Sequence, residues 1–263
     1  MSAPSGRPSA ADFRQRLLAH ELVVGTFIKT PATHPIEIIG GLGFDFVVID
    51  EEHAPFDRVT IDAGLLAARA SNTAGIVRVS EPTAAKLLAV LDDGATGVMV
   101  PHVFSAEKAR DVASACRYRG GKRGFSNTTR AGGFGAVGMW DHVDAGDKAA
   151  TVVAMIEDPE AIEAIDAIVA VDGIDAFFVG RGDLSVAMGA ASMAAPEIMA
   201  ATEKVVAAAK RVNKPVLLMV ANAAEAESAK ALGITGFIVS SDQGFLRQAA
   251  GRLLQDFSSL RAN

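Results

Sequence analysis

Short apolar runs alternate with longer Ala- and Leu-rich segments along almost the whole chain, and this alternation limits the folds that the sequence can adopt. Eight runs have the length and composition of strands: Val23–Lys29, Phe44–Asp50, Gly75–Val79, Gly97–Val103, Thr151–Glu157, Ile174–Gly180, Pro215–Val220 and Gly236–Ser240. Eight segments have helical spacing: His34–Gly41, Arg58–Ala70, Pro82–Asp93, Ala106–Arg117, Pro159–Val171, Pro196–Val212, Ala223–Leu232 and Gln243–Leu260. Nearly every residue of the runs is apolar, as in parallel strands buried on both faces. The pattern predicts an α/β protein with a single (β/α)8 TIM barrel.

The competing α/β fold is a doubly wound sheet, which would place a glycine-rich turn after its first strand. The segment Phe27–Pro31 has no such turn. The 263 residues suit one barrel domain, which we place at residues 12–263, after a disordered tail at residues 1–11. The glycine-rich connection Tyr118–Ala150 breaks the rhythm, and we interpret it as a lid or interface loop.

Composition excludes several classes of function. There are 25 Lys and Arg against 31 Asp and Glu, a net charge of −6, and the pI is near 5.4, so nucleic acid is not an expected partner. The longest apolar runs are strand-sized, and no membrane span is expected. Cys116 is the only cysteine, which is typical of a protein in the reducing cytoplasm.

Ionisable residues gather where the predicted strands end, which is the catalytic face of such a barrel. The second strand ends in Asp50-Glu51-Glu52-His53, the third carries Arg78, the fifth ends in Glu157-Asp158, and the sixth leads into Gly180-Arg181-Gly182-Asp183. Each has a structural interpretation as a helix cap or counter-ion, but their coincidence at one face predicts an active site.

The chemistry of these residues fits a hard divalent cation. Glu157 and Asp183 supply oxygen ligands without imidazole or thiolate beside them, which favours Mg²⁺ or Mn²⁺ over zinc. Arg78 offers a positive charge for an enolate or carboxylate oxygen, and His53 can exchange a proton near neutral pH, with Asp50 placed to orient it.

Taken together, these stretches resemble the HpcH/HpaI group of metal-dependent pyruvate aldolases. The matching segments are Gly43–Pro55, Val77–Val79, Leu91–Ala95, Val100–Val103, Arg117–Gly124, Ile156–Glu157 and Gly180–Ser185. The resemblance implies a class II aldolase, similar to 4-hydroxy-2-oxoheptanedioate and 2-keto-3-deoxy-sugar-acid aldolases. Such an enzyme reversibly cleaves a 4-hydroxy-2-oxo acid, through an enolate held at a divalent metal, to an aldehyde and pyruvate or an analogue such as hydroxypyruvate.

The resemblance also implies roles. Glu157 and Asp183 would bind Mg²⁺ or Mn²⁺, with Co²⁺ as a further option, and Arg78 would stabilise the enolate. His53 would be the base, with Asp50 as its partner and Asp92, at a subunit contact, raising its basicity. Asp183 and the Gly182 amide would lie at the substrate. Family members resemble hexamers, trimers of dimers that exchange a C-terminal helix.

Two residues depart from the family pattern. Met155 stands where a substrate-contacting glutamine is usual, so we count it as a substrate-binding position. Arg181 replaces a proline, and it could recruit an anionic aldehyde or pair with Asp183.

Three alternatives stay open at this point. A Schiff-base aldolase would use Lys29, the one lysine at a predicted strand end. A carbon–carbon lyase acting on acyl-CoA esters would need a basic track, for which Arg181, Arg123 and Arg130 are candidates. A barrel without catalysis would only bind ligands.

Overall fold

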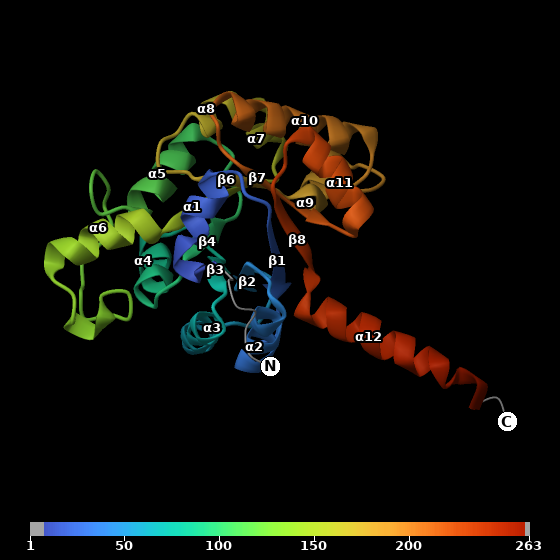
Figure 1. The fold of residues 1–263 in the computed structure, drawn as a ribbon. Helices are drawn as coiled ribbons and strands as arrows, with labels where there is room; N and C mark the ends of the chain where they lie inside the picture. The colour runs from blue at the N-terminus through green and yellow to red at the C-terminus, as the bar shows by residue number, and fades with distance from the viewer. Residues whose placement is uncertain (1–7, 261–263) are drawn as a thin grey trace.

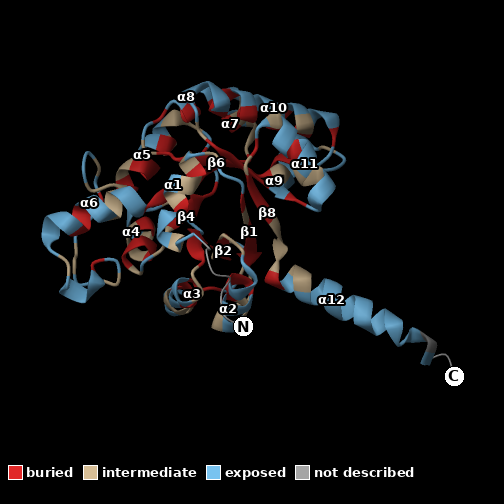
Figure 2. Cartoon of the chain, viewed as in Figure 1, coloured by how far each residue is buried: buried red, intermediate tan, exposed pale blue. Residues whose placement is uncertain are grey.

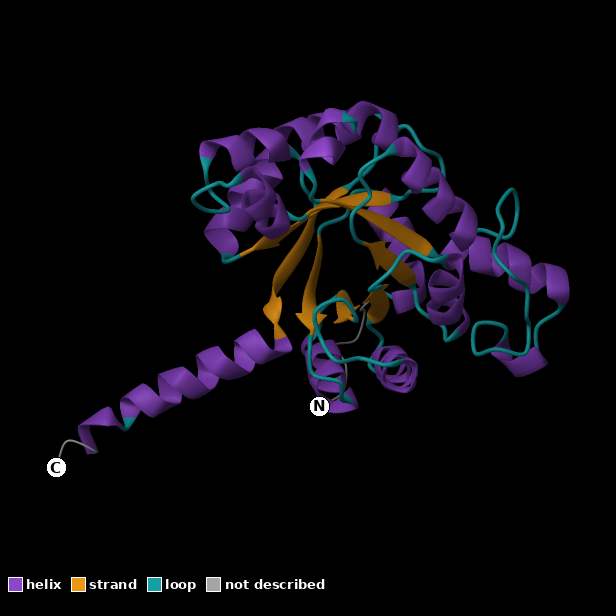
Figure 3. Ribbon diagram, turned by 180° about the vertical axis from the view of Figure 1, so that it is seen from behind, coloured by secondary structure: helices purple, strands orange, loops and turns teal. Residues whose placement is uncertain are grey.

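The computed structural model describes residues 8–260, and its eight strands form one closed parallel barrel in the order β1 to β8 (Figures 1 and 3). The strands are β1 Val23–Ile28, β2 Phe46–Asp50, β3 Ala74–Arg78, β4 Gly97–Val100, β5 Thr151–Ile156, β6 Ala176–Val179, β7 Val216–Val220 and β8 Gly236–Ser241. The predicted (β/α)8 barrel is therefore confirmed, with each predicted strand present and trimmed or extended by a few residues.

Helices cover the outside of the barrel (Figure 3). Their bounds are α1 Phe13–Leu18, α2 Thr33–Leu42, α3 Arg58–Ala70, α4 Ala84–Asp92, α5 Ala106–Cys116, α6 Met139–Ala149, α7 Pro159–Glu163, α8 Ile165–Val169, α9 Arg181–Met188, α10 Pro196–Arg211, α11 Ala223–Leu232 and α12 Asp242–Asp256. The predicted helix Pro159–Val171 is divided at Ala164 into α7 and α8. Side-chain caps start many of these helices, because an Asp, Thr, Ser or Asn oxygen accepts a free first-turn amide: Asp57, Thr83, Ser105, Asn222 and Ser241.

The apolar core forms two layers on either side of the strands. Phe46 and Val48 of β2 point into the barrel, where they join an inner cluster with Met155 and Phe178. Val47 and Ile49, the residues between and after them, join the outer cluster against the helices. Since side chains alternate along a strand, both faces of each strand are apolar, which explains the continuous apolar runs.

The connection Tyr118–Ala150 begins and ends at the amino-terminal end of the barrel. It leaves α5 after Cys116 and returns to the first residue of β5, whose amide bonds the Thr96 carbonyl. It contains α6, which the sequence interpretation missed, and it lies beside α4 and α5 (Figure 1). The lid interpretation is therefore wrong for this chain, because the connection is attached at the end opposite the mouth.

The two ends of the chain differ in how they contact the barrel. At the N-terminal end, Asn72 bonds the Pro8 carbonyl and the Ala10 amide, so ordered contacts begin earlier than the domain boundary expected at residue 12. Residues 1–7 of the expected tail lie outside the described part. At the other end, α12 extends away from the barrel and is exposed along most of its length (Figure 2). None of the helices between residues 8 and 260 is long and apolar enough to cross a membrane.

Candidate active site

The alternation of side chains brings polar residues into the barrel mouth. The inward positions of β2 continue from Phe46 and Val48 to Asp50, and those of β5 continue from Met155 to Glu157. Because inward positions recur at every second residue, the last inward residue of each strand faces the carboxyl end of the barrel. The charged groups singled out from the sequence thus lie around one opening.

Asp50 is the most completely buried charged residue in this opening, with no exposed surface. Its two oxygens accept bonds from Arg78 Nε (2.9 Å) and Nη2 (2.8 Å), and Oδ1 also accepts the His53 backbone amide at 3.1 Å. Lys29 Nζ lies 3.3 Å from Oδ2. Burial raises the pKa of Asp50, but the bonds and charges of Arg78, the His53 amide and Lys29 outweigh burial and lower this pKa below its usual value.

Glu52 extends this pairing toward His53. Its Oε2 lies 3.2 Å from Arg78 Nη1 and 3.8 Å from His53 Nε2. The His53 side chain is 53% exposed and free to meet a ligand. The predicted contact of Asp50 with His53 is thus made to the backbone amide, and the carboxylate beside the imidazole is Glu52.

Glu157 is as deeply placed as Asp50 but is poorly compensated. Its Oε1 accepts the His102 backbone amide at 2.8 Å, while Oε2 is buried with no hydrogen-bond partner among the described residues. Burial raises the pKa of Glu157 to about 7, and the charges of Asp183 and Glu52 act in the same direction.

Gly180 provides the space in which this carboxylate lies. A Cβ at Gly180 would meet Glu157 Oε2 at 2.5 Å, so only glycine leaves the oxygen its place. Two residues later, a Cβ at Gly182 would meet open space. Gly182 and Asp183 belong to the first turn of α9, whose free amides face an anion favourably.

These residues fit a divalent cation. The unpaired Oε2 of Glu157 lacks a positive partner, and the exposed Asp183 supplies a second carboxylate close enough to affect the pKa of Glu157. Within residues 8–260 there is no cluster of three or more His, Cys, Asp or Glu side chains of the kind that encloses a metal. Two carboxylates with open positions for other oxygen ligands are an arrangement typical of Mg²⁺ or Mn²⁺ sites.

His102 lies beside the same carboxylates. Its Nδ1 is 3.1 Å from Asp158 Oδ1 and 3.7 Å from Glu157 Oε1, a pairing that sequence spacing did not reveal. Burial lowers the pKa of His102, but the Asp158 bond and the charges of Glu157, Asp158 and Glu52 raise it overall.

Two of the predicted site residues lie away from the open mouth. Asp92 ends α4 at the amino-terminal end of the barrel, where its Oδ1 pairs with Arg123 Nη2 at 3.2 Å. It does not contact His53 within one chain, so its predicted role requires a second subunit. Met155 is 1% exposed in the inner cluster and forms an apolar floor, not an open contact surface.

The three arginines considered as a basic track are each held by acidic residues. Arg123 is buried against Asp92 and over the Tyr118 ring, and Arg130 binds Asp62. Arg181 donates to the Met219 carbonyl and to Glu225, each at 2.6 Å, and does not pair with Asp183. The structure thus provides no basic track from these residues.

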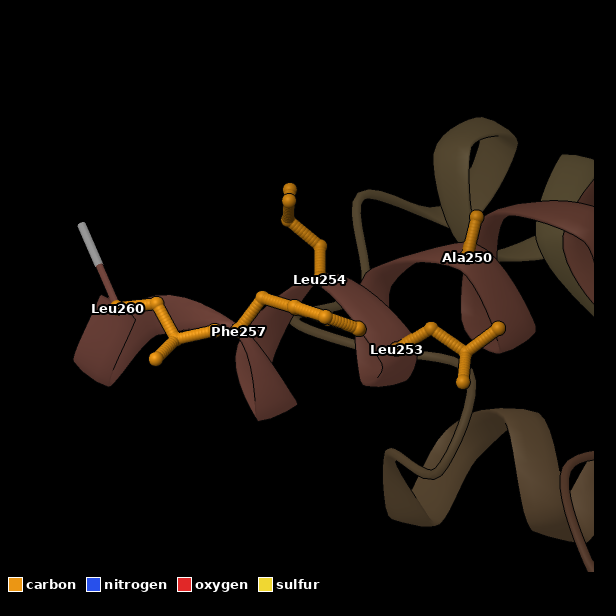
Figure 4. Close-up of a pocket in the computed structure, with 5 residues that line it drawn as sticks. All are labelled: Ala250, Leu253, Leu254, Phe257 and Leu260. Atoms are coloured by element: carbon orange, nitrogen blue, oxygen red, sulfur yellow. The ribbon is translucent and has the colours of Figure 1, made fainter.

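A separate apolar hollow of about 450 Å³ lies on α12, away from the mouth (Figure 4). It is lined by Ala250, Leu253, Leu254, Phe257 and Leu260. Phe245, in the first turn of α12, packs against the barrel core, but Leu253, Leu254, Phe257 and Leu260 are 53–70% exposed and do not dock on the barrel of the same chain.

The closed barrel and its polar carboxyl-end mouth define the class of protein as a (β/α)8-barrel enzyme. Residues 24–247 match the model of the HpcH/HpaI aldolase/citrate lyase family. The chain belongs to this family and is a lyase.

Known proteins of similar sequence and structure agree with this assignment. The chain is 33% identical to the 5-keto-4-deoxy-D-glucarate aldolase of Klebsiella pneumoniae, over 93% of this chain and 96% of that protein. An HpcH/HpaI aldolase from Desulfitobacterium hafniense superposes with a TM-score of 0.87 at 28% identity, covering 93% of this chain and 95% of that one. The citrate synthase SbnG superposes with a TM-score of 0.86 at 27% identity, covering 95% and 98%.

Proposed function

We propose that the chain is a divalent-metal-dependent aldolase that reversibly cleaves a 4-hydroxy-2-oxo acid into an aldehyde and pyruvate, or a close analogue such as hydroxypyruvate. The observation that carries this proposal is the buried Glu157 carboxylate, whose Oε2 has no hydrogen-bond partner among the described residues, in the same mouth as the Arg78–Asp50 pair. Membership of the aldolase family and the likeness to a named keto-acid aldolase support it.

Glu157 and Asp183 would hold the cation, for which the metal-ligand chemistry of two carboxylates favours Mg²⁺ or Mn²⁺. When bound, the cation supplies Lewis-acid polarisation of the substrate keto oxygen. The first-turn amide of Gly182 would bind the substrate carboxylate.

His53 would act as the base in cleavage. It takes the proton of the C4 hydroxyl, the C3–C4 bond breaks, and the aldehyde leaves while the bond electrons form the pyruvate enolate. Arg78, held rigidly by Asp50 and Glu52, stabilises the negative oxygen with its remaining N–H groups. Return of the proton that His53 took to the enolate carbon completes pyruvate and restores the base.

A second copy of the chain is part of the proposal. The apolar residues of α12 and of the segment directly after it are exposed, among them Leu246, Leu253 and Phe257 at 57–71%. Exchange of this helix between partners would cover them, and a trimer of such dimers would give the homohexamer expected from the family resemblance. The lone, buried Cys116 supports a cytoplasmic location.

The direct test is a screen of metals against hydroxy keto acids. Purified protein is treated with chelator, and Mg²⁺, Mn²⁺ or Co²⁺ is added back with each substrate. We expect pyruvate release only with metal. Absence of pyruvate and hydroxypyruvate in every combination would contradict the proposal, and retention of full activity in chelator, with a borohydride-trapped adduct on Lys29, would favour the Schiff-base alternative.

A further inference from the structure

The backbone of His102 has an uncommon conformation on the side of the mouth where Glu157 lies. Its φ is 55°, in the left-handed region that residues with a Cβ rarely adopt. Strand β4 ends at Val100, and the Val103 amide then bonds the Met155 carbonyl of β5 at 3.2 Å. The residues between Val100 and Val103 therefore form a short segment that is held at both ends.

The left-handed φ of His102 directs its amide to Glu157. The peptide plane that carries this N–H rotates about the ψ of Pro101 and the φ of His102. At the observed φ the N–H donates to Glu157 Oε1 at 2.8 Å, and a return of φ to negative values would turn the N–H away. Within residues 8–260 the Glu157 carboxylate accepts this bond alone, and Oε2 accepts none. The amide thus orients the carboxylate and leaves Oε2 for a cation.

The ring of His102 is held by Asp158. Nδ1 lies 3.1 Å and 3.3 Å from the two carboxylate oxygens, and Nδ1 carries the hydrogen because an ionised carboxylate only accepts. Asp158 stands at the N-cap position of α7, where an aspartate ordinarily accepts a first-turn amide, yet its side chain makes no such bond. The Asp158 side chain is therefore committed to His102 and not to its own helix.

We propose that His102 is a positioning residue for the Glu157 carboxylate. Its ring, fixed by Asp158, holds the left-handed backbone that directs the amide to Oε1, so that Oε2 stays available to the cation. This inference rests on the proposed metal site and deepens it by giving a role to two side chains that are not assigned as ligands. Without the ring, a residue with a Cβ should relax to a negative φ, and the carboxylate should lose its donor and bind the cation less tightly.

The test measures the dissociation constant of Mn²⁺ by EPR of the free ion, with the full chain and no substrate. His102→Ala removes the ring and keeps the Cβ, and we expect the constant to rise about 10-fold, as for other groups that orient a metal ligand. His102→Gly also removes the ring but adopts a positive φ without steric cost, so its constant should stay within about threefold of wild type. Recovery in the glycine variant distinguishes a backbone role from a ring that binds the cation itself.

Asp158 gives a second route to the same bond, which keeps the test valid if His102→Ala folds poorly. Asp158→Ala should weaken Mn²⁺ binding as His102→Ala does. Asp158→Asn loses the charge but still offers an oxygen to Nδ1, and it should weaken binding less. In the His102→Gly background the two Asp158 variants should differ little from each other, because no ring remains to be held.

Asn213→Ala is the matched control for backbone strain. Asn213 has a φ of 54°, is exposed, and lies between α10 and β7 at the amino-terminal end of the barrel. Its replacement imposes the same left-handed strain on an alanine far from Glu157. We expect a lower Tm with an unchanged Mn²⁺ constant.

Three results would overturn the inference: an unchanged constant in His102→Ala, equal losses in His102→Ala and His102→Gly, or an equal loss in Asn213→Ala. Failure of the proposed metal site looks different, because wild type would then bind Mn²⁺ no more tightly than Glu157→Gln.

Discussion

The two sides of the barrel mouth hold equally buried carboxylates in opposite electrostatic states. On the β1–β3 side, Asp50 has Arg78, Lys29 and an amide around it, and its pKa is lowered. On the β5–β6 side, Glu157 has one amide donor and an unpaired oxygen, and its pKa is raised to about 7. Burial disfavours charge on both sides, so the counter-charges supplied by the fold decide the outcome. On the first side two cations of the chain lie against the carboxylate, whereas on the second the His102 amide and, at 3.7 Å, the His102 ring are the nearby compensating groups.

The largest expected effect comes from Glu157→Gln, which keeps the shape of the side chain but removes its charge. If the β5–β6 side holds the cation, turnover falls about 1,000-fold or more, because the charge stabilisation supplied there is worth several kcal/mol. The rise in Tm on adding Mn²⁺ should also disappear. Glu51→Gln, on the same rim but paired with Lys86, is the control and should keep both properties. Turnover at the wild-type rate in Glu157→Gln would show that the charge of Glu157 on the β5–β6 side is not needed for catalysis.

Asp50→Asn tests the compensated side. Arg78 would lose the charge of its bidentate partner in a buried site, and we expect the free energy of unfolding to fall by about 3 kcal/mol. Urea denaturation measures this loss. Adding Arg78→Met in the same protein should recover part of it, since no unpaired guanidinium then remains. An unchanged urea midpoint would show that the pairing does not hold the mouth together.

The pH dependence of stability should differ in sign between the two sides. The pKa of the Glu157 carboxyl is about 7 in the folded protein and 4.5 in the unfolded chain. Between these two pH values the folded protein holds a proton that the unfolded chain has lost, so folding takes up a proton. Its contribution therefore lowers the stability of metal-free protein as pH rises from about 4.5 to about 7, by about 3 kcal/mol in total. Asp50, with a lowered pKa, stabilises the fold above its unfolded value of 3.8 and loses this contribution only as pH falls through its folded pKa.

The measurement is the free energy of unfolding of wild type minus that of Glu157→Gln, in chelator, between pH 5 and 8. This difference should decline with rising pH, and saturating Mg²⁺ should remove the decline. A difference that stays flat in chelator would show that Glu157 has an ordinary pKa.

Arg181→Met should have the smallest effect. Arg181 joins the start of α9 to Glu225 and to the end of β7, and loss of this partly exposed pair should cost about 1 kcal/mol. A double-mutant cycle with Glu225→Gln measures the coupling. A coupling near zero would show that this pair does not hold the start of α9 against the end of β7.

The barrel itself was predictable because its signals are local. Apolar runs of strand length alternate regularly with helical segments such as Arg58–Ala70. Asp57 forms a capping box at the start of that helix. Helix α6 was missed because it lies in a segment with many glycines, and because its buried residues are His142 and Val143 alone. Its folding depends on contacts such as that of His142 with Tyr118, which are remote in the sequence.

The sequence was enough to predict which residues belong to the candidate site, but not which of them contact one another. Alternation along each strand identifies Asp50, Arg78 and Glu157 as the last inward residues, so their common location follows from the strands alone. The partners do not follow. Glu52 beside Arg78, Lys29 beside Asp50 and Glu225 beside Arg181 join residues of different strands or loops, and only the closed barrel brings them together.

The amino-acid sequence alone is enough to set the order of elements, the direction of side chains along each strand and the acidic character of the mouth. Each of these features depends on residues that are close neighbours in the sequence. The division of that mouth into a compensated side and an uncompensated side belongs to the tertiary structure. A carboxylate changes its pKa according to what lies within a few ångströms, and those neighbours come from distant parts of the sequence.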